Sequence, residues 1–212
     1  MVEVRTINEF QDTLDKEMSW RVKEIGVFNV ASRKNGAERR SFIRAGVALT
    51  YAHWEGFIKN SSEIYLAYVN HKSLSYRQLK TCFAVFGLKR SLSTLADSKK
   101  ALPNIEAFEF ILNKMDTVAH LQLNSAIKTE SNLSSKVFRN IASSLDIDTS
   151  PYSTRFNLID QSLVDRRNAI AHGEYLDLSG SDFGILVDEV LLLMRQYKTD
   201  LQNAASLESF KR

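Results

Sequence analysis

The residues best suited to chemistry lie together in the last quarter of the chain: Arg167 and Asn168, followed by His172 and Gly173. Histidine has an unperturbed pKa close to neutral, so it can give or take a proton under cellular conditions. Arginine keeps its charge and offers a planar fork of donors that fits a phosphate. An acid–base residue and a phosphate-binding cation are the minimum needed to cut a phosphodiester without a metal ion.

The same residues also have a purely structural interpretation. A histidine in the last turn of a helix is favoured by the helix dipole, and Gly173 is a typical residue just past a helix end. Arg166 and Arg167 can be solvated, or can pair with Asp165 or Asp160. On these residues alone, the structural interpretation is favoured over a catalytic one.

Their spacing on a regular helix separates the candidates. If residues 154–173 form one α-helix, Asn168 and His172 share a face, and Asp165 lies on the same stripe. Arg167 is then about 140° away from His172, so a single helix does not direct both side chains at one phosphate. Either the helix unwinds at its end, or a second copy of the helix supplies the missing group across a twofold axis.

Composition predicts a helical protein. The 212 residues include 44% hydrophobic residues, enough for one substantial core, and only two prolines and eight glycines, so long helices are expected. No apolar run approaches the ~20 residues of a membrane span, and the N-terminus lacks a secretion signal, which predicts a cytoplasmic protein. The net charge of +3 is too small to indicate nucleic-acid binding by itself.

We expect an all-α fold, an up-and-down bundle of about six to seven helices in a single domain over residues 1–212. Thr6 and Glu9 have the form of a capping box, which predicts the start of an N-terminal helix at about 6–25. This helix is expected to pack on a core of about 38–205. A second box, Ser75 with Gln78, predicts a helix that stops near Gly87. The remaining helices are predicted at about 38–71, 103–118, 135–145, 154–173 and 185–205, with loops at 90–102 and 146–153. Ser179 to Asp182 offers a start before the last of these helices, and the apolar residues of 38–71 are typical of the central helix of a bundle.

Several other notable residues are interpreted as structural. Tyr51, Trp54 and Phe57 are expected in the core rather than stacked on bases. His53 is expected in the core or at an interface, and Cys82, in an apolar run, as a buried and inert thiol. No set of His, Asp and Glu has the spacing of a metal site, and no glycine-rich phosphate loop is present.

Two motifs resemble the HEPN family (higher eukaryotes and prokaryotes nucleotide-binding domains). The run from Arg167 to His172 matches the Arg-polar-x-x-x-His signature of that family. Glu55 and Lys59 resemble its acidic-x-x-x-basic element, and residues 44–59 around them are similar to large stand-alone bacterial members. The structural alternative for Glu55 and Lys59 is a surface ion pair that stabilises the helix by ~0.3–0.5 kcal/mol.

The resemblance implies a HEPN-like fold and a metal-independent endoribonuclease that uses no cofactor. In that interpretation His172 is the general acid or base, Arg167 holds the scissile phosphate, and Asn168 orients His172 or the phosphate. The 2′-hydroxyl of RNA attacks the phosphorus and leaves a 2′,3′-cyclic phosphate end. The residues expected to support the cleft are Glu55, Lys59, Asp165 and Arg166.

The resemblance also implies partners. RNA is the expected substrate, and a homodimer would place the helices that carry Arg167 and His172 at its interface. Such proteins are similar to toxins and antiphage effectors, which a nucleotidyltransferase-type antitoxin often neutralises. Two alternatives remain: a non-catalytic HEPN module that binds RNA or nucleotides or acts as a scaffold, and a helical adaptor that uses the aromatic-rich early helix as its partner surface.

Overall fold

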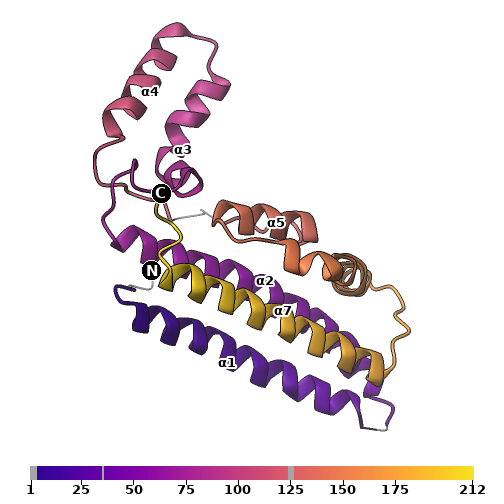
Figure 1. Ribbon diagram of the computed structural model, residues 1–212. Coiled ribbons are helices and arrows are strands. Elements are labelled where there is room, and N and C mark those ends of the chain that lie inside the picture. The colour runs from indigo at the N-terminus through magenta and orange to yellow at the C-terminus, as the bar shows by residue number, and fades with distance from the viewer. Residues whose placement is uncertain (1–3, 35, 124–126) are drawn as a thin grey trace.

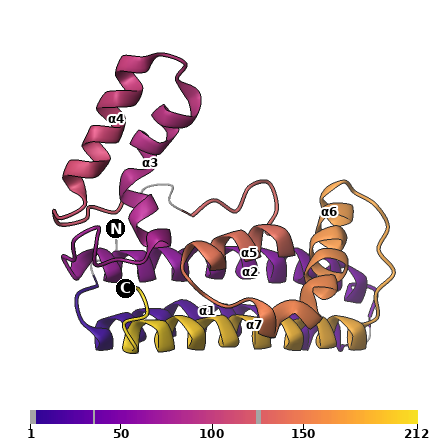
Figure 2. The ribbon, with the colours of Figure 1, turned by 45° about the horizontal axis from the view of Figure 1, so that its top comes forward.

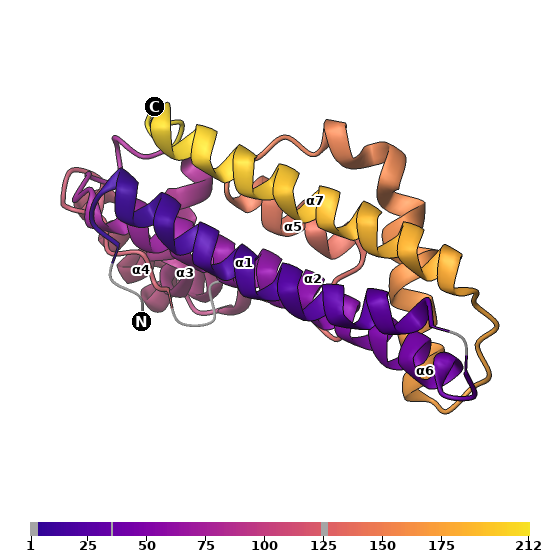
Figure 3. The ribbon, with the colours of Figure 1, turned by 90° about the horizontal axis from the view of Figure 1, so that it is seen from below.

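Three long helices lie side by side and form the layer on which the rest of the protein is built (Figures 1 and 3). They are α1 (Ile7–Ser32), α2 (Arg39–His71) and α7 (Gly180–Ser206). The computed structural model describes residues 4–34, 36–123 and 127–212, and in those ranges the only β-structure is two isolated bridges. The predicted all-α fold is confirmed. None of the helices in these ranges combines the length and the apolar character needed to cross a membrane.

Shorter elements cover one face of this layer. They are α5 (Ser135–Ser144), the 3₁₀ helix η1 (Ser150–Arg155), the π-helix η2 (Leu158–Asp165) and the short α6 (Arg166–Ala171). A hairpin of α3 (Thr81–Asp97) and α4 (Ala101–Lys114) projects from the C-terminal end of α2, at the end of the molecule opposite to α6 (Figure 2). The candidate residues on α6 therefore lie at the end of the molecule where α1 ends and α2 begins (Figure 3).

Aromatic side chains fill the contact between α2, α5 and α7. The Phe138 ring contacts the rings of Trp54, Tyr152 and Tyr197 at centroid distances of 5.4, 5.0 and 5.6 Å. The Tyr197 hydroxyl, in turn, shares a 2.8 Å hydrogen bond with Ser62 on α2. These rings join four elements, α2, α5, η1 and α7. The predicted burial of Tyr51, Trp54 and Phe57 is confirmed.

Sequence signals at several helix ends are confirmed. Thr6 and Glu9 form the full capping box, with the Thr6 side chain accepting from the Glu9 N–H and the Glu9 side chain accepting from the Thr6 N–H. Ser179 caps α7 by accepting from the Asp182 N–H. The N-terminal helix is longer than predicted and continues to Ser32, because Ile25 and Ser32 are still buried near its end.

The single cysteine, Cys82, was expected to be buried but is only partly buried in the structure. Burial raises the pKa of its thiol.

The prediction for residues 79–102 is wrong. The helix does not stop near Gly87 but runs through it to Asp97, so most of the expected loop at 90–102 is helical. A Cβ at Gly87 would lie 2.4 Å from the Tyr76 hydroxyl oxygen and 2.9 Å from the His120 carbonyl oxygen. The absence of a side chain at Gly87 therefore allows Tyr76 and the His120 carbonyl group to pack closely against α3. Ser75 and Gln78 form a turn: the Gln78 side chain accepts from the Ser75 N–H, and α3 starts only at Thr81.

The next two boundaries also differ from prediction. Helix α4 begins at Ala101, before Pro103, since the first turn of a helix needs no backbone N–H at that position. It ends at Lys114 rather than near Val118, where the Ser75–Val118 bridge forms instead. Residues 146–153, expected as a linker, partly form the 3₁₀ helix η1, which buries Tyr152.

Residues 154–173 do not form one regular α-helix, which corrects the prediction on which the spacing argument rested. Residues 158–165 are π-helical, and α-helical geometry returns only at Arg166. A π-turn closes after five residues, so it brings Ile159 and Val164 onto the same face beside Leu163. All three side chains are buried. The wider turn thus gives this segment a broader buried face than an α-helix would have.

One face of α4 carries apolar side chains that nothing in the described protein covers. Leu102, Ile105, Phe108 and Leu112 recur every three or four residues, and each is more than half exposed. Ala107, on the opposite side of α4, is its only buried residue. The hairpin thus contributes little of its apolar surface to the core.

We predict that the same substitution changes stability much more on α5 than on α4. Phe138→Ala should lower the free energy of unfolding by about 3–5 kcal/mol, because it leaves a cavity among three rings. Phe108→Ala removes a ring that is 54% exposed, so its effect should stay within about 1 kcal/mol. Urea unfolding followed by circular dichroism measures both. Equal losses would contradict the assignment of α5 to the core and of this face of α4 to the surface.

Candidate functional site

The short helix α6 ends at the residue that the sequence singled out as its acid or base. His172 is the C-terminal cap, and Gly173 adopts the left-handed conformation with φ of 77°. The Glu174 N–H donates to the Ala169 carbonyl at 2.8 Å, and the Gly173 N–H donates to Ile170 at 3.1 Å. This pair of bonds is the Schellman arrangement, in which glycine avoids the strain of a positive φ. The His172 side chain is left exposed at the helix end.

Two arginines of α2 contact the segment that follows α6. Arg44 donates from Nη1 to the Glu174 carbonyl oxygen at 2.5 Å, and the Arg40 guanidinium lies over the Tyr175 ring, 5.8 Å from its centroid. These contacts hold the residues after His172 against the start of α2. The exposed imidazole is therefore carried by a tethered segment.

Arg167 points back toward α2. Its guanidinium carbon lies 4.7 Å from the centroid of the Tyr51 ring, within the range of a cation–π contact. Its Nη1 donates to the side-chain oxygens of Asn132 and Asn168, each at 2.9 Å. The Asn168 amide is thus turned toward Arg167. The pairing of Arg167 with Asp160 that the sequence allowed does not occur, because the Asp160 carboxylate accepts from the Ser135 N–H and hydroxyl.

Tyr51 joins this arginine to the core and to the segment before α5. Its hydroxyl accepts from the Leu133 N–H at 2.8 Å. Burial raises the pKa of Tyr51 to about 12; the Glu55 carboxylate also raises it, while the Leu133 N–H and Arg167 act in the opposite direction. Thr129 donates to Glu55 Oε1 at 2.6 Å. The structure therefore brings Arg167, Asn168 and Glu55 together around Tyr51.

Lys59 is exposed and stands apart from this cluster. Among the ion pairs of the described residues, none joins Glu55 to Lys59. The i,i+4 ion pair that the sequence allowed is therefore absent, because Glu55 turns to Thr129 and Tyr51 instead. Lys59 acts on its other i,i+4 neighbour and lowers the pKa of Glu63, against the larger raising effect of burial.

Arg167 and His172 do not meet within one copy of the chain. No hydrogen bond or ion pair of the described residues connects them, and Arg167 is held toward Tyr51 while His172 is exposed at the end of α6. Asp165 is exposed and Arg166 half-buried, and the ion pairs of the described residues include neither. The separation expected from α-helical spacing is therefore present, although the helix is irregular before Arg166.

The other notable histidine, His53, belongs to the core. It is buried, its ring meets Trp20 edge-on, and its Nε2 lies 2.8 Å from a Glu24 carboxylate oxygen. Burial lowers the pKa of His53, although Glu24 acts in the opposite direction. His53 thus serves the contact between α1 and α2. In the described ranges, no group of three or more His, Cys, Asp or Glu side chains is arranged to hold a metal ion.

Three members of the cluster were not identified from the sequence as site residues: Tyr51, Thr129 and Asn132. Tyr51 was correctly placed in the core, but its contact with Arg167 was not foreseen. Its spacing is a usable signal, because Tyr51, Glu55 and Lys59 recur every four residues along one side of α2. Thr129 and Asn132 lie in a segment without periodicity, and their positions depend on tertiary contacts.

We predict that Tyr51→Phe destabilises the protein by about 1–3 kcal/mol at neutral pH, because the buried Leu133 N–H loses its acceptor while the ring remains under Arg167. The pKa of Tyr51 is higher in the folded state, about 12, than in the unfolded state, so this residue's contribution to stability is complete below pH ~10 and is lost as pH rises toward 12. Urea unfolding should therefore show a shallower alkaline loss in the variant.

Tyr175→Phe is the matched control for this experiment. Tyr175 is 70% exposed, so the loss of its hydroxyl should change stability by less than about 0.5 kcal/mol. Equal behaviour of the two variants would contradict a hydrogen bond from Leu133 to Tyr51.

Comparison with known proteins identifies the family. A family model described as RiboL-PSP-HEPN matches residues 16–203, which include α2, the Tyr51 cluster, α6 and most of α7. No curated protein and no solved structure matches the chain. The family-model match spans most of the sequence and includes both motifs that resembled HEPN proteins. The chain therefore belongs to the RiboL-PSP-HEPN family, whose HEPN-type domain is consistent with a nucleotide-binding or ribonuclease-like module.

Proposed function

We propose that this protein is a metal-independent endoribonuclease. The observation that carries the proposal is the arrangement on α6: Arg167 is fixed by Tyr51, Asn132 and Asn168, and His172 is exposed at the end of the same helix. A fixed guanidinium and an exposed imidazole are the groups that cleavage of a phosphodiester needs, once a second copy of the helix brings them together. Membership in a HEPN family supports the same interpretation.

The proposed reaction uses the nucleophile of the substrate. The ribose 2′-oxygen attacks the adjacent phosphorus, the P–O5′ bond breaks, and the 2′ proton passes to a base. The departing 5′-oxygen takes a proton from an acid, so the products are a 2′,3′-cyclic phosphate and a 5′-hydroxyl. His172 would perform one of these proton transfers, and Arg167 would stabilise the charge that develops on the phosphate oxygens.

A homodimer is part of the proposal. Arg167 and His172 of one α6 do not meet, and no residue of α6 is buried, so its outer surface is free to face a second α6. A twofold axis beside α6 would place the His172 of one copy near the Arg167 of the other. Glu55 would support the cleft through Tyr51, while Lys59, Asp165 and Arg166 would lie nearer its rim. The proposed biological role is that of a toxin or antiphage effector, with a nucleotidyltransferase-type antitoxin as its partner.

We predict that the purified protein cleaves single-stranded RNA in excess EDTA. His172→Ala and Arg167→Ala should each lower the rate by at least ~10²-fold, the usual contribution of an acid–base residue. His71→Ala, at the exposed end of α2, is the matched control and should retain full activity. Gel electrophoresis of end-labelled RNA, with detection of cyclic-phosphate ends, measures the rates. Cleavage by folded His172→Ala at the wild-type rate would refute the mechanism.

A substrate with one 2′-deoxy nucleotide tests the chemistry separately. The bond after that nucleotide should resist cleavage, because the attacking oxygen is missing, while flanking bonds are still cut. Cleavage at the deoxy position would show that water or another nucleophile attacks instead. The same RNA in its unmodified form is the control.

A second candidate function is a non-catalytic HEPN module that binds RNA or nucleotides or acts as a scaffold. Two observations favour it: the contacts of Arg167 with Tyr51 and Asn132 already give this arginine a packing role, and α4 exposes an apolar face. The early aromatic helix offers little aromatic surface to a partner, since Phe42 is exposed but the other aromatics of α2 are buried. RNA binding without cleavage, equal in wild type and His172→Ala, would support this candidate.

A further inference from the structure

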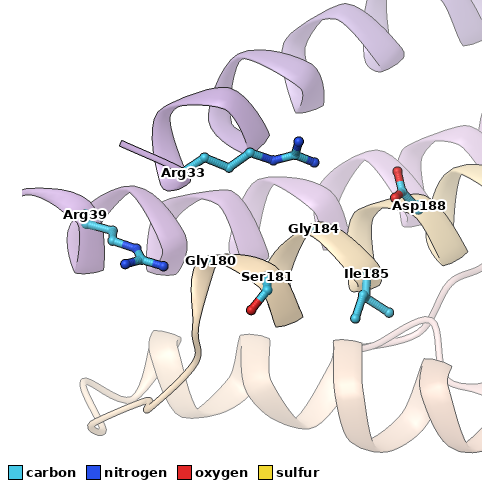
Figure 4. Close-up of a pocket in the computed structure, with 7 residues that line it drawn as sticks. All are labelled: Arg33, Arg39, Gly180, Ser181, Gly184, Ile185 and Asp188. Atoms are coloured by element: carbon cyan, nitrogen blue, oxygen red, sulfur yellow. The ribbon is translucent and has the colours of Figure 1, made fainter. Parts of the chain in front are cut away.

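A groove opens where the end of α1, the start of α2 and the start of α7 meet (Figure 4). Its volume is about 450 Å³, within the range of small-ligand sites. Arg33 and Arg39 line one side of it, and the first turns of α7 line the other. The α7 residues that line the groove are Gly180, Ser181, Gly184, Ile185 and Asp188.

Arg39 is held in place at this groove. Its Nε donates to the Ser32 carbonyl oxygen at 3.1 Å, and its guanidinium points toward Gly180 (Figure 4). A Cβ at Gly180 would lie 2.8 Å from Arg39 Nη2 and 2.5 Å from the Ser32 carbonyl oxygen. Glycine is therefore required for the start of α7 to approach Arg39 and the end of α1. Within the part of the chain that the structure describes, no other hydrogen bond engages the Arg39 guanidinium, so its two Nη groups can donate to a ligand.

The charge of the groove is positive. No ion pair among the described residues includes Arg33 or Arg39, and Asp188 is the one acidic residue in its lining. Two guanidinium groups facing one carboxylate leave a net charge of about +1 at neutral pH. The start of the 27-residue helix α7 adds the positive end of its dipole. This combination suits an anion that accepts several hydrogen bonds.

The groove lies at the same end of the molecule as the candidate site. The segment from His172 to Ser179 links α6 to α7, and Arg44 and Arg40 hold it against α2 between the two places. An extended chain of that length spans at most ~28 Å, which limits the distance from His172 to the groove. One strand of RNA is long enough to reach both.

We propose that Arg33 and Arg39 bind a backbone phosphate of single-stranded RNA whose cleaved phosphate lies at Arg167 and His172. The guanidinium forks of both residues would recognise the phosphate group. A free nucleotide carries the same group, so the experiment distinguishes RNA from a free nucleotide as the ligand. The assignment of RNA to the groove rests on the proposed function, whereas phosphate binding there does not.

The test measures binding in the non-cleaving His172→Ala background, by fluorescence anisotropy of a labelled single-stranded RNA at several salt concentrations. The variant Arg33→Gln with Arg39→Gln should weaken binding and reduce the slope of log affinity against log salt by about 0.7, the value for one phosphate charge that is no longer neutralised. Arg33→Gln alone should give about half of that change. It also covers the case in which Arg39→Gln disturbs folding, because Arg33 is exposed.

Lys16→Gln with Arg195→Gln is the matched control, because both residues are exposed, carry the same charge and do not line the groove. Its salt slope should equal that of the His172→Ala background. A reduction by both pairs would show that only net charge matters and would overturn the proposal. An unchanged slope in Arg33→Gln would overturn it as well.

Adenosine monophosphate separates the two phosphate sources. If the nucleotide binds through Arg33 while RNA binding is independent of Arg33, the groove is a free-nucleotide site and the RNA assignment is overturned. In proteins with His172 intact, the Arg33 variant should raise KM without lowering kcat. A reduced salt slope with no RNA cleavage by the wild type would keep the subsite and refute the ribonuclease. RNA cleavage by the wild type, together with an unchanged salt slope in the Arg33 variant, would support the ribonuclease and refute the subsite.

Discussion

The contact between the Arg167 guanidinium and the Tyr51 ring connects the core of this protein to its candidate site. Tyr51 is 2% exposed, so its position is set by the packing of α2. One face of its ring carries the charge of Arg167, and its hydroxyl holds the backbone of Leu133. A change in the packing of α2 would therefore move the cation that the proposed reaction needs. Removal of the arginine side chain would uncover one face of the Tyr51 ring. The stability of the fold and the proposed activity therefore both depend on Tyr51.

Much of the fold follows from local signals in the sequence. The capping residues Thr6 and Ser179 predicted where α1 and α7 begin, because each satisfies backbone donors that a helix start leaves free. The apolar and aromatic pattern of residues 38–71 predicted a buried central helix. Gly87 misled the prediction, because glycine marks both a helix end and a close approach, and only the position of Tyr76 distinguishes them.

The candidate site could be predicted in part. The short motif on α6 indicated Arg167, Asn168 and His172, and the structure places all three at one accessible end of the bundle, although their roles remain proposals. The partners of Arg167 could not be predicted, because Asn132 and Tyr51 are distant in sequence and meet it only through tertiary packing. For the same reason, the groove between Arg33, Arg39 and Gly180 has no signature in the sequence.

The π-helix η2 immediately precedes α6 and has a consequence for how this family can vary. A π-turn behaves as one residue inserted into an α-helix, so it fixes the angular phase of everything that follows it. Arg167 meets Tyr51 in this phase. If a relative lost one residue from η2, α6 would turn by about 100° and carry Arg167 away from α2, although the motif itself stayed intact. Two chains with identical motifs therefore need not have equivalent sites if this segment differs in length.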